Sequence, residues 1–249
     1  MARQKGIITI EGTLTGINFY VLKGVPVARK AGGGFNGKAI KTQPNMARVR
    51  ENSSEFGHCS RVKKLLKDAL DPFLMHYQDV SLHGRMMRML TQIKDLDLIS
   101  ERGKRNVGQG LLHAAGKNIL KNFVFTPQQS ISHVMGKKGN FDRNDYTYRC
   151  TNVALQKSAF PSAATHAALT LGVLVFDFET LTPHLFLSET QMMEPGFQTA
   201  SLVLQPKQLT SPNGMQMVFL GLTFYQEING IKHVLKEQKN TGLEVVAVL

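Results

Sequence analysis

The residue types that most often do chemistry are present, but their spacing matches no catalytic or metal-binding motif. The eight histidines stand at 58, 76, 83, 113, 133, 166, 184 and 233. None forms HxH or HExxH, and only His76 and His83 flank a carboxylate, Asp79. Cys59 and Cys150 are far apart and belong to no CxxC pair, which indicates two buried, reduced thiols. The sequence therefore predicts no metal site, no disulfide and no cofactor.

Two stretches come close to known motifs and fail at the residues that matter. Gly32–Ala39 nearly matches the phosphate-binding GxxxxGK[ST] loop, but Ala39 has no hydroxyl for magnesium and Pro44 interrupts the expected helix. Ser60–Lys63 matches SxxK without the companion motifs of a serine acyl-enzyme. The acidic residues are too scattered to suggest a two-carboxylate hydrolase. We therefore expect no catalytic residue, no small-molecule substrate and no enzymatic activity.

The whole chain has a formal net charge of +12, and its positive charge is concentrated in the first part. Residues 1–150 hold 25 Lys and Arg against 11 Asp and Glu, whereas residues 151–249 hold 5 against 7. Every arginine lies in the first part. This asymmetry predicts either an anionic partner such as nucleic acid or a contact with an acidic face of a neighbouring copy.

The sequence pattern of the C-terminal half is typical of an antiparallel β-domain. Residues Val218, Leu220, Leu222, Phe224 and Ile228 alternate with more polar positions, which predicts a half-buried strand. Asn229-Gly230 is typical of a type I′ turn and predicts a hairpin that continues at Ile231. Further strands are expected in six segments: Ile131–Met135, Tyr146–Leu155, Ala167–Glu179, His184–Ser188, Thr199–Leu204 and Leu243–Leu249. This spacing predicts an immunoglobulin-like or jelly-roll sandwich over residues 125–249, with Phe176, Phe178 and Phe186 in its core.

The middle of the chain, residues 45–124, reads as a basic helical region. A long helix is expected from Asn45 towards Leu70, where Asp71-Pro72 ends it. Its apolar stripe is Met46, Val49, Ser53, Phe56, Cys59, Val62, Leu66 and Ala69. A second helix follows Ser81, with Leu82, Met86, Met89, Leu90, Ile93 and Leu96 on its apolar side. A third is expected over residues 110–123, with Leu111, Leu112, Ala115, Ile119 and Phe123 facing inward. We expect a common basic surface for a polyanion, formed by Arg48, Arg50, Arg61, Lys63, Lys64, Arg102, Lys104 and Arg105.

Residues 1–44 are expected to form a β-hairpin followed by a flexible glycine-rich loop, Ala31–Thr42. Lys23-Gly24 supplies a turn, and Pro26 predicts that the strand Val25–Ala28 is an edge or turns its missing N–H away from a neighbour. The stretch Gly16–Tyr20 is echoed by Gly221–Tyr225, which suggests that the two hairpins are equivalent pairing elements. The candidate self-association residues are Gly16, Ile17, Phe19, Tyr20, Val25 and Val27.

Four stretches together resemble a widespread family of uncharacterised bacterial proteins: MARQKGI at 1–7, RENSSEFG at 50–57, SERGKRNV at 100–107 and FYQEINGIKHVLK at 224–236. The resemblance spans nearly the whole chain. It implies the order of N-terminal hairpin, helical middle and C-terminal β-domain, and it implies no activity.

Two functional hypotheses follow from an α+β chain of this kind. The first is a structural subunit that self-associates through its N-terminal hairpin and complementary charged surfaces into a virus-like particle, tube or filament. The alternative is a nucleic-acid-binding protein that uses the basic helical region on phosphates. We expect cytoplasmic synthesis without a signal peptide and without a membrane span, because the N-terminal apolar run is broken by Glu11 and the longest apolar stretch, residues 169–176, is short.

Overall fold

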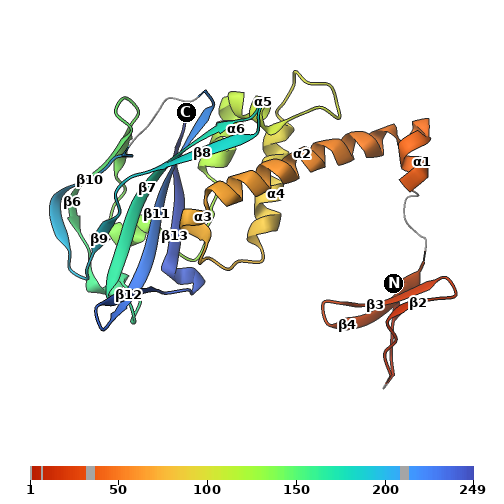
Figure 1. The fold of residues 1–249 in the computed structure, drawn as a ribbon, viewed down its shortest axis with the longest axis horizontal. Coiled ribbons are helices and arrows are strands. Elements are labelled where there is room, and N and C mark those ends of the chain that lie inside the picture. Colours follow the sequence, from red (N-terminus) through yellow and green to blue (C-terminus); the bar gives the residue numbers. More distant parts are fainter. Residues whose placement is uncertain (1, 7, 32–36, 208–212) are drawn as a thin grey trace. The chain divides into compact units, whose positions relative to one another are not determined.

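The computed structural model describes residues 2–6, 8–31, 37–207 and 213–249. The predicted α+β class is confirmed, because N-terminal strands precede a helical middle and a C-terminal antiparallel sheet (Figure 1). The chain divides into two compact units, 1–50 and 51–249. The helical middle from residue 51 onward and the C-terminal β region thus belong to one unit, and buried helix residues share a core with residues of three C-terminal strands.

The first unit contains a four-stranded antiparallel sheet in the order β1-β4-β3-β2. Its strands are β1 (Ala2–Arg3), β2 (Gly12–Leu14), β3 (Ile17–Leu22) and β4 (Val25–Lys30). The edges of this sheet are therefore β1 and β2. Of the two alternatives that Pro26 predicts, the edge strand is wrong, because β4 pairs with both β1 and β3 and Pro26 lies opposite Val21. Pro26 is tolerated inside the sheet just where β1 ends, and its carbonyl accepts a hydrogen bond from the Gln4 amide.

The predicted tight turns are confirmed by backbone conformation. Asn229 and Gly230 have φ values of 53° and 77°, which are the two positive angles of a type I′ turn. Lys23 and Gly24, at 50° and 78°, repeat this geometry between β3 and β4. The similar stretches Gly16–Tyr20 and Gly221–Tyr225 differ in structure at their first residue. Gly16 lies in a turn at φ 79°, whereas Gly221 lies inside a long strand.

The glycine-rich segment does not continue as a loop. Its residues 32–36, and with them most of the phosphate-loop-like motif, lie outside the described residues. The remainder forms a short helix, α1 (Gly37–Thr42), followed by a 3-10 turn η1 (Pro44–Met46) and the long helix α2 (Ala47–Ala69). The first unit ends within α2, at Arg50.

Four further helices follow α2 in the helical middle of the chain, before residue 125. They are α3 (Asp71–Leu74), α4 (Leu82–Lys94), α5 (Val107–Leu112) and α6 (Ala114–Lys121). The single helix expected over 110–123 is two helices, because the chain is extended at His113, with φ −79° and ψ 139°. The break turns Leu112 outward, where it is 64% exposed, so its predicted inward position is wrong. The close approach of α5 to α4 depends on Gly110, because a Cβ at this position would lie 1.9 Å from the carbonyl oxygen of Ile93.

Two antiparallel sheets form the β part of the second unit. The larger has the order β12-β11-β7-β8, and β13 also pairs with β11 while β9 pairs with β7. Its strands are β7 (His166–Asp177), β8 (Thr182–Leu187), β9 (Gln191–Met193), β11 (Met215–Ile228), β12 (Ile231–Val234) and β13 (Thr241–Val248). The smaller sheet, β10-β6-β5, contains β5 (Asn140–Asp142), β6 (Thr147–Ala154) and β10 (Gln198–Leu204). Short 3-10 turns lie at η2 (Lys157–Ala159) and η3 (Gln238–Asn240).

The larger sheet is the middle of three layers in this unit, with α2–α6 on one face and the smaller sheet, together with α7 (Ile131–Met135), on the other (Figure 1). Val218, Leu220 and Leu222 pack towards the smaller sheet, as predicted for one face of a sandwich. Met217 and Phe219 on the opposite face pack against the helices. The expectation of a half-buried strand is therefore wrong, because both faces are covered. The same alternation places Phe176 and Phe178 on the helical side, away from the sandwich core that contacts Phe186.

One expected strand, Ile131–Met135, is the helix α7. Ile131, Val134 and Met135 are buried at spacings of three and four, which suits one helical face. The Glu244 carboxylate accepts a hydrogen bond from the Ile131 amide at 2.8 Å and so caps the start. Gly136, in the left-handed conformation at φ 70°, ends the helix.

Candidate functional site

The N-terminal sheet has two chemically different faces, which the strand register defines. Residues that pair directly across an antiparallel sheet point to the same face. One face, here called the apolar face, carries Leu14, Ile17, Phe19, Val21, Pro26 and Ala28, with Lys30 opposite Ile17 at one end. The other, here called the arginine face, carries Arg3, Thr13, Asn18, Tyr20, Val27 and Arg29, with Leu22 and Val25 at one end.

The apolar face is poorly covered in this structure. Leu14, Ile17 and Val21 are 58%, 42% and 47% exposed, and Val27 is the one residue of the described first unit that belongs to the buried apolar set. Sheets in stable domains bury at least one face against another layer. The apolar face is thus largely uncovered by the described residues of its own unit.

The six residues predicted for self-association all belong to this sheet but not to one surface. Ile17 and Phe19 lie on the apolar face, whereas Tyr20, Val25 and Val27 lie on the arginine face and Gly16 forms the turn between β2 and β3. The period of two along a strand makes this division inevitable, because Phe19 and Tyr20 are neighbours in sequence.

A buried ionic network lies where α2 meets the loop before α5. The Glu55 carboxylate is 3% exposed and accepts hydrogen bonds from Lys94 Nζ at 2.6 Å and from the Gly103 amide at 2.7 Å. Arg105 adds a bidentate pair through Nε and Nη2, both at 2.8 Å. Hydrogen bonds from Arg105 and Lys94 outweigh burial and hold the pKa of Glu55 at about 2. The carboxylate is therefore charged and fully engaged, which fits a structural clamp.

Two neighbouring groups complete this clamp. Asp97, also buried, accepts amide hydrogen bonds from Ile99, Ser100 and Asn106 and so shapes the loop. His58 on α2 accepts the Val107 amide through Nε2 at 3.1 Å, and burial together with the Arg61 charge lowers the pKa of His58. A neutral imidazole is required for that acceptor role.

The basic residues predicted to share a polyanion surface are used in different ways. Arg105 is held by Glu55, Arg102 Nε lies 3.3 Å from Glu51, and Lys104 Nζ lies 2.9 Å from Glu101. Arg50 belongs to the first unit, where its Nη1 donates to the carbonyls of Ile40 and Gln43 at the end of α1. Of the other four, Arg61 and Lys64 are exposed and Lys63 half-buried on α2, and Arg48 is exposed in the first unit. These pairings make the loop arginines less available to phosphates.

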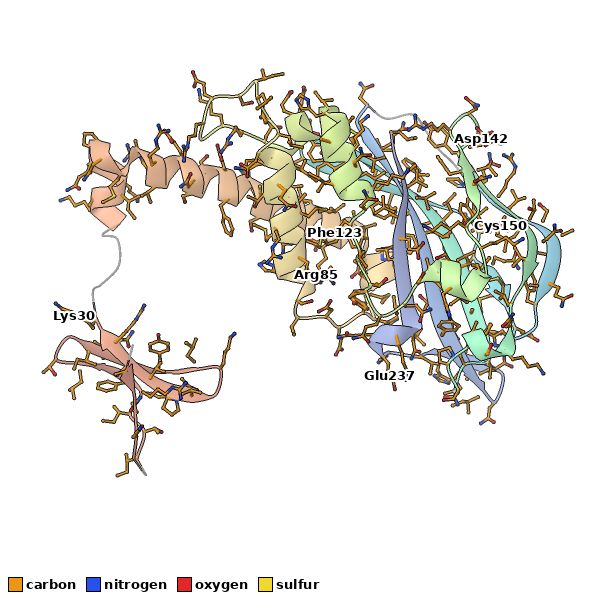
Figure 2. The ribbon with its side chains drawn as sticks, turned by 180° about the vertical axis from the view of Figure 1, so that it is seen from behind. Lys30, Arg85, Phe123, Asp142, Cys150 and Glu237 are labelled. Atoms are coloured by element: carbon orange, nitrogen blue, oxygen red, sulfur yellow. The ribbon has the colours of Figure 1, made fainter. Side chains whose placement is uncertain are left out.

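A second arginine of the helical region is also a structural group. Arg85 donates to Asp79 at 2.7 Å and to the carbonyl of Phe125, and its guanidinium lies over the Phe123 ring at 5.8 Å (Figure 2). Burial raises the pKa of Asp79, but hydrogen bonds from Ser81 and Arg85 hold it at about 2. Arg85 thus joins α4 to the segment after α6.

A pocket of about 690 Å³ lies between α5, α6 and the ends of β7 and β11. Phe176, Phe178 and Leu112 line it together with Lys117 and Asp177. The Asp177 carboxylate accepts bonds from the Glu179 amide and from the amide and hydroxyl of Thr180, so it organises the turn after β7. Within the described ranges, no group of three or more His, Cys, Asp or Glu side chains could hold a metal ion.

Cys59 and Cys150 are both buried, as predicted. None of the helices in the described part of the chain combines the length and apolar character that a membrane crossing needs. Comparison of the chain with protein-family models, with curated proteins and with solved structures finds no match.

Proposed function

We propose that this chain is a non-enzymatic structural subunit that self-associates through its N-terminal sheet into a larger assembly such as a virus-like particle, tube or filament. The observation that carries the proposal is the apolar face, whose side chains Ile17 and Val21 on the inner strand β3 are 42% and 47% exposed. Covering such a face yields about 25 cal/mol for each Å² of apolar surface removed from water.

The edges of the sheet favour contact through the face over strand addition. The edge strands β1 and β2 contain two and three residues, and short edges resist pairing with another chain. A face-to-face contact between two copies lets the same residues meet across a twofold axis. Such a twofold contact produces a closed dimer, so a larger assembly requires a second contact elsewhere on the chain.

Charge opposes this contact at long range and gives it a recognisable signature. Residues 1–50 hold nine Lys and Arg and a single acid, Glu11. Two such units repel each other, and salt screens that repulsion over about 8 Å at physiological ionic strength. Self-association through the apolar face should therefore strengthen as salt is added.

Deletion of residues 1–30 tests the proposal. The shortened chain should stay folded by circular dichroism, because the second unit has its own core, and should lose the oligomeric mass of the full chain. Unchanged oligomeric mass would show that the contact lies elsewhere. Loss of the folded state would assign the sheet to the chain's own core instead.

Nucleic-acid binding by the helical region is the second candidate. Exposed Arg61 and Lys64 on α2 favour it, while the ion pairs of Arg102 and Arg105 weaken it. Substituting Arg61 and Lys64 by Gln should abolish binding of a single-stranded oligonucleotide if this candidate is correct.

A further inference from the structure

The N-terminal unit carries far more net charge than its size would suggest. Its 50 residues account for +8 of the formal +12, whereas residues 51–249 hold 21 Lys and Arg against 17 Asp and Glu. In the second unit five cations of the helical region lie at ion-pair distance from carboxylates, namely Arg85, Lys94, Arg102, Lys104 and Arg105, and residues 51–124 hold 12 Lys and Arg against 8 Asp and Glu. The strongest unbalanced charge is thus in the first unit and outside the helical region.

The sheet register places two of these cations together on one face. Arg3 pairs with Val27, which pairs with Tyr20, so these three side chains form one row of the arginine face. The next row is Arg29, Asn18 and Thr13. The Arg29 guanidinium lies over the Tyr20 ring at 5.5 Å from its centre. Arg3 and Arg29 are both exposed.

We propose that the arginine face binds the phosphate backbone of nucleic acid without sequence preference. Arg3 and Arg29 contact phosphate oxygens, which guanidinium groups recognise through two parallel hydrogen bonds. Tyr20 and the guanidinium above it offer a flat surface on which a base can stack. The hydroxyl and amide of Thr13 and Asn18 add polar contacts along the same row.

The arrangement favours nucleic acid over an anionic membrane. A membrane-bound sheet needs its cations beside its apolar surface, so that side chains insert while charges meet the headgroups. Here Lys30 lies beside Ile17 on the apolar face, whereas both arginines lie on the face opposite Ile17, Phe19 and Val21. A sheet lying on its apolar face would turn Arg3 and Arg29 away from the lipid.

An acidic surface on a second copy is also a poorer match. Residues 151–249 have a net charge of only −2. Three of their carboxylates already pair with lysines, namely Glu189 with Lys207, Glu227 with Lys232 and Glu237 with Lys239. A phosphodiester chain supplies one negative charge per nucleotide and meets the arginine face more completely.

The test uses the full-length chain and fluorescence anisotropy with a labelled single-stranded DNA of mixed sequence and about 20 nucleotides, longer than the roughly 4–16 nucleotides that one single-strand-binding domain covers. We expect binding that weakens with salt. The double variant Arg3→Gln, Arg29→Gln should raise the dissociation constant and reduce the slope of log K against log salt by about 0.7 for each arginine. Arg3→Lys, Arg29→Lys should keep that slope, which separates charge from loss of folding.

The matched control is Arg61→Gln, Lys64→Gln, which removes two exposed cations from α2. It should leave DNA binding unchanged. Equal loss in both double variants, or loss in the control alone, would overturn the proposal, as would no binding by the unsubstituted chain. Binding to vesicles of phosphatidylserine and phosphatidylcholine without binding to DNA would assign the face to membranes instead. The salt dependence distinguishes DNA binding from self-association, because self-association strengthens with salt whereas DNA binding weakens.

Discussion

Arg105 grips Glu55 with two parallel hydrogen bonds, Nε to Oε1 and Nη2 to Oε2, each 2.8 Å long. Fifty residues separate the two in sequence, and the pair fastens the loop before α5 to the first turns of α2. Together with the Lys94 bond it makes a buried network in which every charged group has a partner. The basic stretch Ser100–Arg105 suggests nucleic-acid binding when only the sequence is considered. In the structure its Arg105 makes an internal ion pair that stabilises the fold.

The first prediction concerns acid stability. The folded-state pKa of Glu55 is about 2, below its ordinary value of 4.5, so its charge stabilises the fold above pH 4.5. That contribution, roughly 3 kcal/mol from the size of the shift, is lost as the pH falls from 4.5 towards 2. Urea unfolding at a series of pH values measures it.

Glu55→Gln should flatten this part of the pH profile. It leaves Lys94 and Arg105 without their shared carboxylate and should lower the free energy of unfolding by about 3–5 kcal/mol at pH 7. Glu101→Gln is the matched control, because Glu101 pairs with Lys104 at the surface. An equal effect of both substitutions would refute the structural role assigned to Glu55.

The second prediction concerns the joint between the helices and the large sheet. The Phe73 ring sits on Gly172 and Gly221, and a Cβ at Gly221 would lie 2.1 Å from its Cδ1 atom. Gly221→Ala should therefore displace the ring and cost about 1–3 kcal/mol by overpacking. Gly57→Ala, at an open position on α2, should instead stabilise by up to about 1 kcal/mol. Thermal unfolding of both variants checks the opposite signs, and a tolerated Gly221→Ala would contradict the contact.

The third prediction concerns thiol reactivity. Burial raises the pKa of both Cys59 and Cys150, so neither presents a thiolate at neutral pH. Ellman's reagent should label neither cysteine in the native chain and both in guanidinium chloride. Rapid labelling under native conditions would show that one of the two sites opens.

Much of the fold could be predicted from local signals. Asn229-Gly230 and Lys23-Gly24 fixed two hairpins, because few residue pairs accept two positive φ angles in succession. Asp71-Pro72 lies just after α2, which ends at Ala69 as expected, but it begins the next helix, α3, because proline is tolerated in a first helical turn. The alternation in β11 gave one of its two faces correctly.

The errors arose where long-range packing decides. Ile131–Met135 is too short for its pattern to separate strand from helix, and Glu244, 113 residues away, caps it as a helix. On α2 the buried positions are Glu55, Cys59, Val62 and Leu66, whereas Phe56 is 60% exposed. Glu55 could be recognised only through its spacing to Cys59 and Val62, because its partners are distant in sequence.

The division of the N-terminal sheet into two faces could not be predicted from residue types either. Ile17, Phe19, Tyr20, Val25 and Val27 all suit a strand, and only the register assigns each to a side. The same register brings Arg3 and Arg29 to one surface from strands that lie far apart in sequence.

Sedimentation equilibrium of the full chain and of two double variants tests the central claim most directly. Ile17→Thr, Val21→Thr makes the apolar face polar while keeping β-branched side chains, and Leu22→Thr, Val25→Thr makes a similar change on the arginine face. The unsubstituted chain should exceed the monomer mass of 27.6 kDa, increasingly so at high salt. The apolar-face variant should return to that mass and the arginine-face variant should not. A monomeric unsubstituted chain at every concentration, or equal behaviour of the two variants, would contradict assembly through the apolar face.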